Sequence, residues 1–498
     1  MLSILPLPHT RRVPMPLSRG TLRAACVMAA AATLACGRSD GQQRTPRQAA
    51  GATRRAAAAS PSAPGARPVA SAAQARVSRP DSLRALYVNG WAAGSRSRMR
   101  NLIRIADSTE INAFVIDVKE SDTFLVHDST GIALAKEIGA DQRPGSRWLP
   151  ALLDTLRAHR IYPIARIVVF KDRGLAEKKP ELAIRTTGGA VWKDNKGKPW
   201  VNPYDRRVWD YNVAIAREAL DMGFHEVQWD YVRFPDVTDA VRRTMAFPGS
   251  GGTSRWQNIR DFIEYSRRQL APYRAPVSAD IFGVMTNVPD DMGIGQVWEE
   301  VVQAADNLHP MVYPSHYRGG YYGFSVPDAH PYEVVRIALE DGVGRRALLQ
   351  GPGRRTARIE PWLQAFTADY LPGHATYTAG SVRNQIQATY DAGLSGWILW
   401  NPRSEFAAYE PALRPARGGL SPLERGGWRP VRWQVPRNRL STVLTRRPAA
   451  GASVRRDSAA SVAPARPASG RPASRRPAAG RPEPTRPAPV HAPAAPRG

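Results

Sequence analysis

The most constraining feature of this sequence is one kind of segment that recurs eight times, an apolar or β-branched run that becomes polar at its C-terminal end. Such runs are typical of strands that are buried on both faces of a parallel sheet. In the clearest example, 226–236, the run reaches Asp230 and Arg233 and is stopped by Pro235. The other seven predicted strands are 85–91, 113–120, 162–172, 276–284, 306–317, 345–353 and 396–403.

Amphipathic stretches that predict helices lie between these strands, at 98–108, 149–159, 206–222, 259–272 and 381–392. Two of them end at a glycine, Gly223 and Gly393, which is a common helix stop. Strand and helix alternating eight times over about 330 residues predicts an α/β protein with a (β/α)8 TIM barrel at 81–410. A doubly wound open sheet is the alternative. It would be expected to have a glycine-rich phosphate-binding turn after its first strand, and residues 89–91 do not form one.

The formal net charge of +27 is carried by the two ends of the chain. Residues 81–410 contain 40 basic and 39 acidic residues, so the predicted barrel is close to neutral. We therefore do not expect specific nucleic-acid binding, which would need a basic patch. Both ends are rich in Ala, Pro, Arg and Ser and poor in bulky apolar residues. This composition predicts disorder at 37–80 and 446–498, with a partly ordered extension at 411–445.

The N-terminal segment 1–36 has the layout of a secretory signal peptide, with several arginines followed by an apolar run and then Cys36. Residues 33–36 are similar to a bacterial lipoprotein cleavage box, in which Cys36 would be acylated and would anchor the protein to a membrane, although Thr33 stands where Leu is usual. Plain secretion is the alternative. In both cases we expect the mature domain outside the cytoplasm, in the periplasm or cell envelope or secreted. Cys26 and Cys36 are the only cysteines, so we expect no disulfide, thiolate nucleophile or cysteine metal site in the barrel. We also expect no cofactor.

Alternation along the strands predicts which side chains face the barrel axis, because neighbouring residues of a strand point to opposite sides. In 226–236 the polar Gln228 and Asp230 alternate with apolar residues, so this pair is expected to face inward. The same rule places Tyr87 and Gln350 inward. It also predicts a polar and aromatic ring at the C-terminal mouth of the barrel, made of Asn89, Asp117, Lys119, Arg166, Asp230, Asp280, His309, Tyr313 and Trp400.

The composition of this ring favours a catalytic role. A barrel stabilised by packing alone would fill such positions with Val, Ile and Leu. Asp117, Asp230 and Asp280 among aromatic side chains are instead suited to glycoside hydrolysis, which needs one acid to protonate the leaving oxygen and a second carboxylate that attacks or activates water. The flat faces of Trp91 and Trp400 would suit the apolar faces of pyranose rings.

Four ordered motifs make the chain similar to a known family. They are YVNGW at 87–91, IDVKE at 116–120, QWDYVRFP at 228–235 and PMVYPSHY at 310–317. These motifs resemble those of the glycosyl hydrolase domain found in bacterial envelope proteins, a family placed by similarity among the TIM-barrel glycosidases. The resemblance covers residues 84–410 and implies a glycosidase-like fold outside the cytoplasm. We therefore predict a glycoside hydrolase that acts on an extracytoplasmic or cell-envelope polysaccharide or oligosaccharide, with the sugar left open.

Asp230 is the first candidate for a catalytic carboxylate. Asp280 is its expected partner, because the ends of neighbouring strands, about 4.8 Å apart, bring side chains within the roughly 5 to 10 Å that glycosidase pairs need. By analogy with the amylase-like barrels Asp230 would be the nucleophile and Asp280 the acid, although those enzymes usually have Glu at the second position. The shorter Asp280 leaves open an inverting mechanism or a different acid such as Asp117, which beside Lys119 is equally suited to positioning substrate. The residues expected to contact substrate are Asn89, Trp91, Lys119, Arg166, Arg233, His309, Tyr313, His316 and Trp400.

Two other functions compete with this prediction. A metal-dependent hydrolase would use Asp230, Asp280, His309 and His316 as ligands, but barrels of that kind commonly have a His-x-His pair on the first strand, which residues 87–89 lack. A catalytically inactive barrel that binds glycan is the second alternative. The long loops expected to shape one side of the cleft and to form a flap over it are 171–202 and 236–255.

Overall fold

The computed structural model describes residues 77–414 except 123–124, 129 and 143–144. The predictions of a signal peptide, a lipidated Cys36 and disordered tails concern segments 1–76 and 415–498 and so lie outside the described residues.

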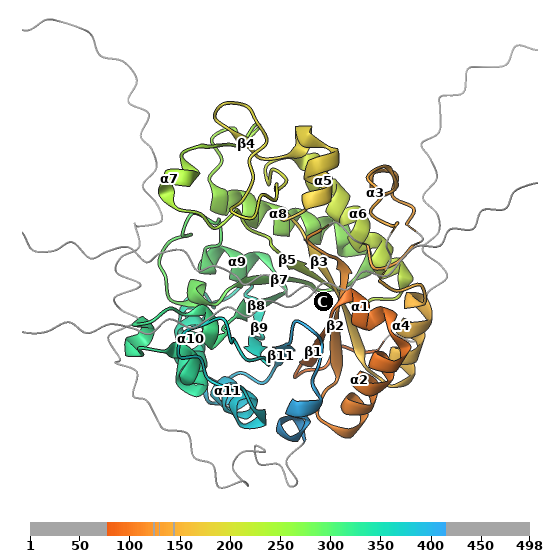
Figure 1. The fold of residues 1–498 in the computed structure, drawn as a ribbon, viewed down its shortest axis with the longest axis vertical. Helices are drawn as coiled ribbons and strands as arrows, with labels where there is room; N and C mark the ends of the chain where they lie inside the picture. Colours follow the sequence, from red (N-terminus) through yellow and green to blue (C-terminus); the bar gives the residue numbers. More distant parts are fainter. Residues whose placement is uncertain (1–76, 123–124, 129, 143–144, 415–498) are drawn as a thin grey trace, which may run out of the picture. The chain divides into compact units, whose positions relative to one another are not determined.

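A closed barrel of eight parallel strands forms the centre of the described chain (Figure 1). Its strands in chain order are β1 (Arg84–Val88), β2 (Ala113–Lys119), β3 (Tyr162–Val168), β5 (Glu226–Asp230), β7 (Val277–Phe282), β8 (Asn307–Met311), β9 (Arg358–Ile359) followed by β10 (Trp362–Gln364), and β11 (Trp397–Trp400). The pieces β9 and β10 share the seventh place, since β9 pairs with β8 and β10 pairs with both β8 and β11. The pairing of β11 with β1 closes the cylinder, which confirms the predicted TIM barrel over the open sheet.

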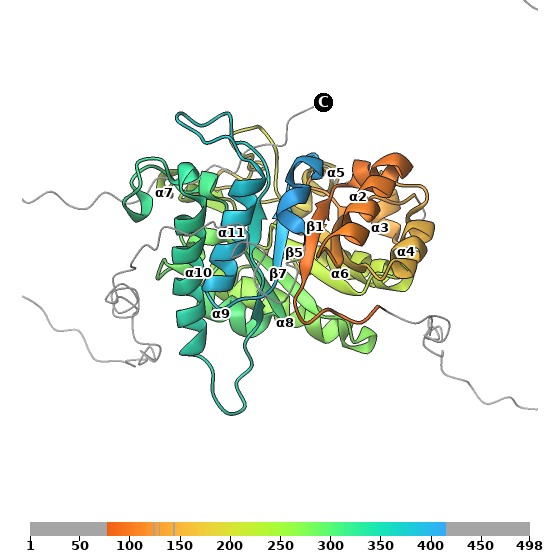
Figure 2. The ribbon, with the colours of Figure 1, turned by 90° about the horizontal axis from the view of Figure 1, so that it is seen from below.

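Helices surround the barrel because each strand is apolar on its outer face and must be covered. The longer helices are α2 (Arg96–Ser108), α4 (Leu149–Ala158), α6 (Arg206–Met222), α8 (Arg255–Leu270), α9 (Trp298–Ala304), α10 (Pro331–Ala347) and α11 (Ala379–Asp391). Capping side chains set the starts of several of them: for example, Asp205 caps α6, and Ser254 with Gln257 forms a capping box on α8. Figure 2 shows α10 and α11 lying side by side against the barrel. None of the helices within the described part of the chain is long and apolar enough to cross a membrane.

The predicted seventh strand at 345–353 is wrong, because residues up to Ala347 are the last turn of α10. Arg345 is buried on that helix, where it donates to both carboxylate oxygens of Glu299. Gln350, predicted to face the axis, is exposed. The true strand was missed because Glu360 and Pro361 interrupt it, so that no continuous apolar run marks it.

The two long loops that follow β3 and β5 pair with each other. They contain α5 (Arg173–Lys178), α7 (Asp239–Arg242) and two short strands, β4 (Arg185–Thr186) and β6 (Met245–Ala246). β4 and β6 pair in antiparallel fashion as a small separate sheet. Two further short helices, α1 (Gly90–Gly94) and α3 (Ala133–Glu137), follow β1 and β2. The loops that the sequence predicted as separate features are therefore one structural unit beside the barrel mouth.

Candidate active site

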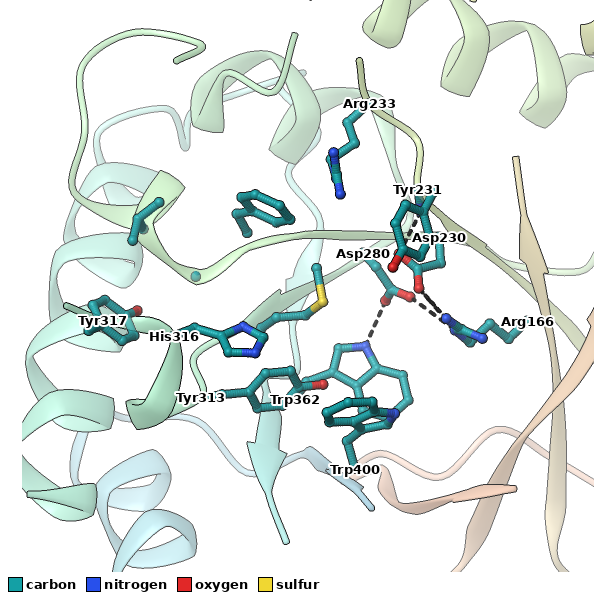
Figure 3. Close-up of a pocket in the computed structure, with 14 residues that line it drawn as sticks. Arg166, Asp230, Tyr231, Arg233, Asp280, Tyr313, His316, Tyr317, Trp362 and Trp400 are labelled. Atoms are coloured by element: carbon teal, nitrogen blue, oxygen red, sulfur yellow. Dashed lines mark hydrogen bonds and ion pairs between the residues drawn. The ribbon is translucent and has the colours of Figure 1, made fainter. Parts of the chain in front are cut away.

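A pocket opens among the C-terminal ends of the barrel strands, where TIM-barrel enzymes keep their active sites (Figure 3). Asp230, Phe282, Met311 and Trp400 line it and are the last residues of β5, β7, β8 and β11. The sequence-predicted residues that line this pocket are Arg166, Asp230, Arg233, Asp280, Tyr313, His316 and Trp400. The remaining lining residues are Tyr231, Phe282, Gly283, Val284, Met311, Tyr317 and Trp362.

Arg166 connects two of the three predicted carboxylates. Its Nε donates to Asp230 Oδ2 at 3.1 Å and its Nη2 contacts the same oxygen, while Nη1 pairs with Asp117. Burial acts to lower the pKa of Arg166, but the charges of Asp117 and Asp230 outweigh it and hold that pKa well above its ordinary value. The guanidinium therefore stays charged and holds the Asp230 carboxylate in a fixed orientation at the pocket wall.

Asp280 is fully buried and has two chemically different oxygens. Oδ1 accepts hydrogen bonds from Gln228 Nε2 at 2.5 Å and from Trp362 Nε1 at 2.7 Å. Oδ2 accepts none from the described residues. Burial raises the pKa of Asp280, opposed by the contact with His309, and the nearby charge of Asp230 raises it further. This carboxyl group therefore keeps its proton to a higher pH than an ordinary aspartate does.

The two pocket carboxylates are close enough to act on one bond. Arg166 Nε lies 3.1 Å from Asp230 Oδ2 and 4.0 Å from Asp280 Oδ2. The two oxygens are therefore no farther apart than about 7.1 Å, which is below the upper limit of roughly 9.5 Å known for glycosidase pairs. The expectation that Asp230 and Asp280 converge is met.

Neither Asp117 nor Lys119 lines the pocket. Asp117 is buried behind Arg166 and also accepts a hydrogen bond from Tyr87 Oη. Lys119 donates to Asp172 Oδ2 at 2.5 Å and lies 5.2 Å from the ring of Tyr211 on α6, away from the barrel axis. The pairing of β2 with β3 shifts register between Asp117 and Lys119, which breaks the strict alternation used to predict an inward Lys119.

Asn89 and Trp91 lie outside the pocket as well. Asn89 is the N-cap of α1: its Oδ1 accepts from Ala92 N at 2.8 Å and its Nδ2 donates to Pro402 O at 3.0 Å. Trp91 is 66% exposed on the same short helix. The YVNGW motif therefore turns the chain away from β1 and does not supply the predicted pocket contacts.

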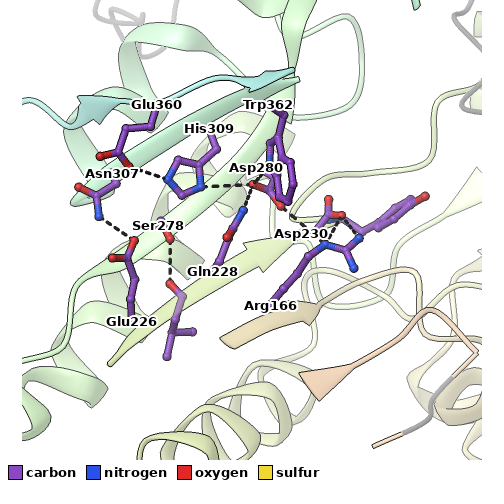
Figure 4. Close-up of polar contacts among 12 residues, drawn as sticks. Arg166, Glu226, Gln228, Asp230, Ser278, Asp280, Asn307, His309, Glu360 and Trp362 are labelled. Atoms are coloured by element: carbon purple, nitrogen blue, oxygen red, sulfur yellow. Dashed lines mark hydrogen bonds and ion pairs between the residues drawn. The ribbon is translucent and has the colours of Figure 1, made fainter. Parts of the chain in front are cut away.

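His309 lies beneath Asp280 in a buried polar chain along the barrel axis (Figure 4). Its Nε2 is 3.2 Å from Glu360 Oε2, and its Nδ1 is 3.5 Å from Asp280 Oδ1, an ion-pair distance longer than a well-formed hydrogen bond. Burial acts to lower the pKa of His309, but Asp280 and Glu360 raise it to about 9. Glu360 is held in turn by Arg79 Nη2 at 2.8 Å. His309 therefore supports Asp280 from below and does not line the pocket.

An aromatic wall faces the carboxylates. The rings of Tyr313 and Trp400 are stacked with centroids 5.2 Å apart, and His316 meets the edge of Tyr313 at 4.9 Å. Burial lowers the pKa of His316 to about 4, so its imidazole is neutral at physiological pH. These three predicted residues are brought together as expected, and they offer flat apolar faces with one neutral hydrogen-bonding group.

Trp362 and Tyr231 line the pocket and Glu120 lies beside Asp117, and sequence reasoning assigned none of the three to the site. Trp362 was missed because its strand was misplaced. Tyr231 follows Asp230 with φ of +48°, a strained conformation for a tyrosine that alternation does not reveal. Glu120, at the end of β2 beside Asp117, has a pKa raised to about 8 by burial and by the charge of Asp117. Its position within the IDVKE motif was the available signal.

The described residues contain no cluster that supports the metal-dependent hydrolase alternative. Among the described residues, no three His, Cys, Asp or Glu side chains form a group that could hold a metal ion. His309 has Glu360 on its far side, and His316 lies against Tyr313, so the four proposed ligands do not form one centre.

A closed parallel barrel with a pair of aspartates in its C-terminal pocket is the architecture of a TIM-barrel hydrolase. The family described as "Putative glycosyl hydrolase domain" matches residues 85–406, and the chain belongs to this family. The protein is thus a glycoside hydrolase by class, and the resemblance based on the four motifs is confirmed.

Other comparisons add similar structures. No curated protein matches the chain. Among solved structures, a hypothetical protein from Ruminiclostridium thermocellum ATCC 27405 is 37% identical over 39% of this chain and 96% of its own, with a TM-score of 0.36. The glycoside hydrolase domain of PgaB (BpsB) from Bordetella bronchiseptica is 14% identical over 67% of this chain and 99% of its own, with a TM-score of 0.48. The α-galactosidase TtGalA from Thermus thermophilus, in complex with stachyose, is 14% identical over 67% of this chain and 64% of its own, with a TM-score of 0.42.

Proposed function

We propose that this protein hydrolyses glycosidic bonds of an extracytoplasmic, cell-envelope polysaccharide, with Asp280 as the acid and Asp230 as the second catalytic carboxylate. The observation that carries the proposal is the contrast between two carboxyl groups that line one pocket from neighbouring strands. Asp230 is bound to the cationic Arg166, whereas Asp280 is fully buried and has a raised pKa. Groups whose surroundings differ in this way are suited to the separate roles of base and acid.

Asp280 is assigned as the general acid because its Oδ2 accepts no hydrogen bond from the described residues. Gln228 and Trp362 both bind Oδ1, so Oδ2 is left as the oxygen that carries the proton. A proton held there is available to the leaving oxygen of a glycosidic bond that lies between the two carboxyl groups. His309 supports Asp280 from the side opposite the pocket and fixes its position.

Asp230 is assigned as the nucleophile or the base. Its carboxylate is held by the ion pair with Arg166. A charged carboxylate on the face of the sugar opposite the acid either attacks the anomeric carbon directly or activates a water molecule. The anomer that is released first, followed by NMR during hydrolysis, distinguishes the two courses.

The aromatic wall supports a sugar as the substrate. Tyr313 and Trp400 present ring surfaces to the pocket, which suits the apolar faces of pyranose rings. The neutral His316 supplies a hydrogen-bonding group for a sugar hydroxyl. The envelope location rests on the signal-like segment 1–36 and Cys36. Labelling cells with a radioactive fatty acid tests it, because Cys36→Ala should abolish incorporation if Cys36 is acylated.

The proposed activity is tested with purified protein and a panel of bacterial envelope polysaccharides, by measuring reducing ends released over time. We expect at least one polymer to be cleaved, and Asp230→Asn to lose about 10²- to 10⁴-fold of the rate while keeping its fold. A wild type that binds a polymer but releases no reducing ends would support the inactive glycan-binding alternative. Loss of activity in a chelator, restored by a divalent cation, would support the metal-dependent alternative.

A further inference from the structure

Arg233 is a second arginine in the pocket, and its surroundings differ from those of Arg166. It follows β5 in the loop and is 5% exposed. Of its five N–H donors, the only hydrogen bond made within the described chain runs from Nη1 to Phe234 O at 3.0 Å. No carboxylate of the described residues lies within ion-pair distance of it, whereas Arg166 is held by both Asp117 and Asp230.

Aromatic rings hold Arg233 in place without neutralising it. Its guanidinium carbon lies 5.2 Å from the ring of Trp200, 5.0 Å from that of Tyr231 and 4.5 Å from that of Phe282. Such contacts engage the flat face of a guanidinium and leave the N–H groups, which lie in its plane, free to bind an anion. Trp200 belongs to the long loop after β3, so that loop does help to build this side of the pocket.

The guanidinium is directed into the pocket. Figure 3 shows Arg233 and Arg166 approaching the pocket from different directions, with Asp230 and Tyr231 between them. Burial lowers the pKa of Arg233, and the charges of Tyr231, Asp236 and Asp230 offset only part of that effect. A buried cation that lines a binding pocket and lacks an ion-pair partner is costly to keep unless a ligand supplies the missing anion.

We propose that Arg233 is the recognition site for a carboxylate on the substrate, so that the glycan cleaved by this enzyme is an acidic one. This inference rests on the proposed function, and it adds the substrate class to it. The planar fork of a guanidinium matches a carboxylate with two parallel hydrogen bonds. Arg166 is already bound by two aspartates, so Arg233 is the pocket arginine with N–H groups left for such a ligand.

Sugars that carry such a group include hexuronic acids, with the carboxylate on the ring, and sugars with a lactyl ether. The probes are therefore hyaluronan and alginate oligosaccharides for the first kind, and peptide-free peptidoglycan glycan strands for the second. Each is paired with its carboxyl-reduced form, in which the carboxylate has become an alcohol. Binding is measured by calorimetry on the full chain carrying Asp230→Asn, and hydrolysis is measured on the wild type.

Two variants separate recognition from folding. Arg233→Gln removes the charge, and Arg255→Gln is the matched control, because Arg255 lies over the rings of Phe234 and Phe247 outside the pocket. We expect one carboxylated probe to bind about 10- to 100-fold more tightly than its reduced form. Arg233→Gln should remove this preference, and Arg255→Gln should retain it. The comparison of native and reduced probes on the chain with Arg233 intact needs no Arg233 variant, so it holds even if Arg233→Gln fails to fold.

The outcomes separate this inference from the proposed function. Equal affinity for the native and reduced forms, a preference for a phosphorylated glycan, or no binding of any carboxylated probe would overturn the inference. Cleavage of a neutral glycan with no effect of Arg233→Gln would leave the proposed function standing and remove the acidic substrate. Binding that depends on Arg233, with no cleavage of any probe, would support the recognition site and contradict the hydrolase.

Discussion

Arg166 on β3 donates from Nε to the Oδ2 of Asp230 on β5 at 3.1 Å, and the same nitrogen lies 4.0 Å from Asp280 Oδ2 on β7. This side chain thus orients Asp230 and lies within ion-pair distance of Asp280, the other proposed catalytic carboxylate. With Asp117 bound to the other side of its guanidinium, Arg166 is the charge on which the electrostatics of the pocket depend.

Removing Arg166 should destabilise the protein as well as inactivate it. Arg166→Met leaves two buried carboxylates without their partner, which costs about 3 to 5 kcal/mol of unfolding free energy. Asp117→Asn in the same chain should recover part of that loss. Urea denaturation measures both effects. Arg157→Met is the control, because Arg157 pairs with Asp154 on the outer face of α4 and such pairs contribute about 0 to 1 kcal/mol. Equal losses from the two arginine variants would contradict the assignment.

The hydrogen bond from Trp362 to Asp280 should affect the pH above which kcat/KM falls. The indole N–H stabilises the charged form of Asp280, so Trp362→Phe should raise the pKa of this carboxyl group. If Asp280 is the acid, the pH above which kcat/KM falls should move upward by about one unit. Trp397→Phe is the control, since the Trp397 indole donates to Tyr390 outside the pocket. An unmoved alkaline limb would mean that another group is the acid.

His309 should make stability fall as the pH rises above neutrality. Its pKa is raised from 6.5 to about 9 in the folded protein. The folded state therefore binds an extra proton between these values, and the stabilisation present below about pH 6.5 is lost as the pH rises through 9. The size is on the order of 3 kcal/mol at most. Denaturation curves at pH 6, 7.5 and 9.5 should show this loss for the wild type and a flatter profile for His309→Gln.

Glu120 should also make the stability of the protein fall as the pH rises, over a lower range of pH. Its pKa is raised from 4.5 to about 8, so its contribution to stability is greatest below about pH 4.5 and is lost as the pH rises through 8. Glu120→Gln keeps an oxygen that can accept from the Gly90 amide and removes the ionisation. The variant should therefore become more stable relative to the wild type as the pH is raised from 5 to 8.5. A constant difference across that range would show that Glu120 does not hold a proton.

The barrel could be predicted because its strands are visible in the sequence as apolar runs. Asp230 and Asp280 could be placed because the alternation of inward and outward residues holds along β5 and β7. Prediction failed where a local interaction overrode the pattern. The register shift in β2 turned Lys119 outward to Asp172, and Asn89 serves as a helix cap.

The seventh strand shows a second limit of the sequence pattern. Glu360 and Pro361 divide it, so Trp362 gave no strand signal, and Arg345 was assigned to a strand although it lies on a helix. The buried chain from Arg79 through Glu360 to His309 joins segments far apart in sequence, and such contacts leave no local pattern.

The most direct test of the central claim compares leaving groups. Once a cleaved sugar is known, its dinitrophenyl glycoside leaves without a proton, whereas the natural linkage needs one. If Asp280 is the acid and Asp230 the second carboxylate, Asp280→Asn should lose about 10²- to 10⁴-fold on the natural linkage and little on the dinitrophenyl glycoside, while Asp230→Asn should lose both activities. Equal losses on the two substrates for Asp280→Asn, or full activity in Asp230→Asn, would contradict the paired-aspartate account.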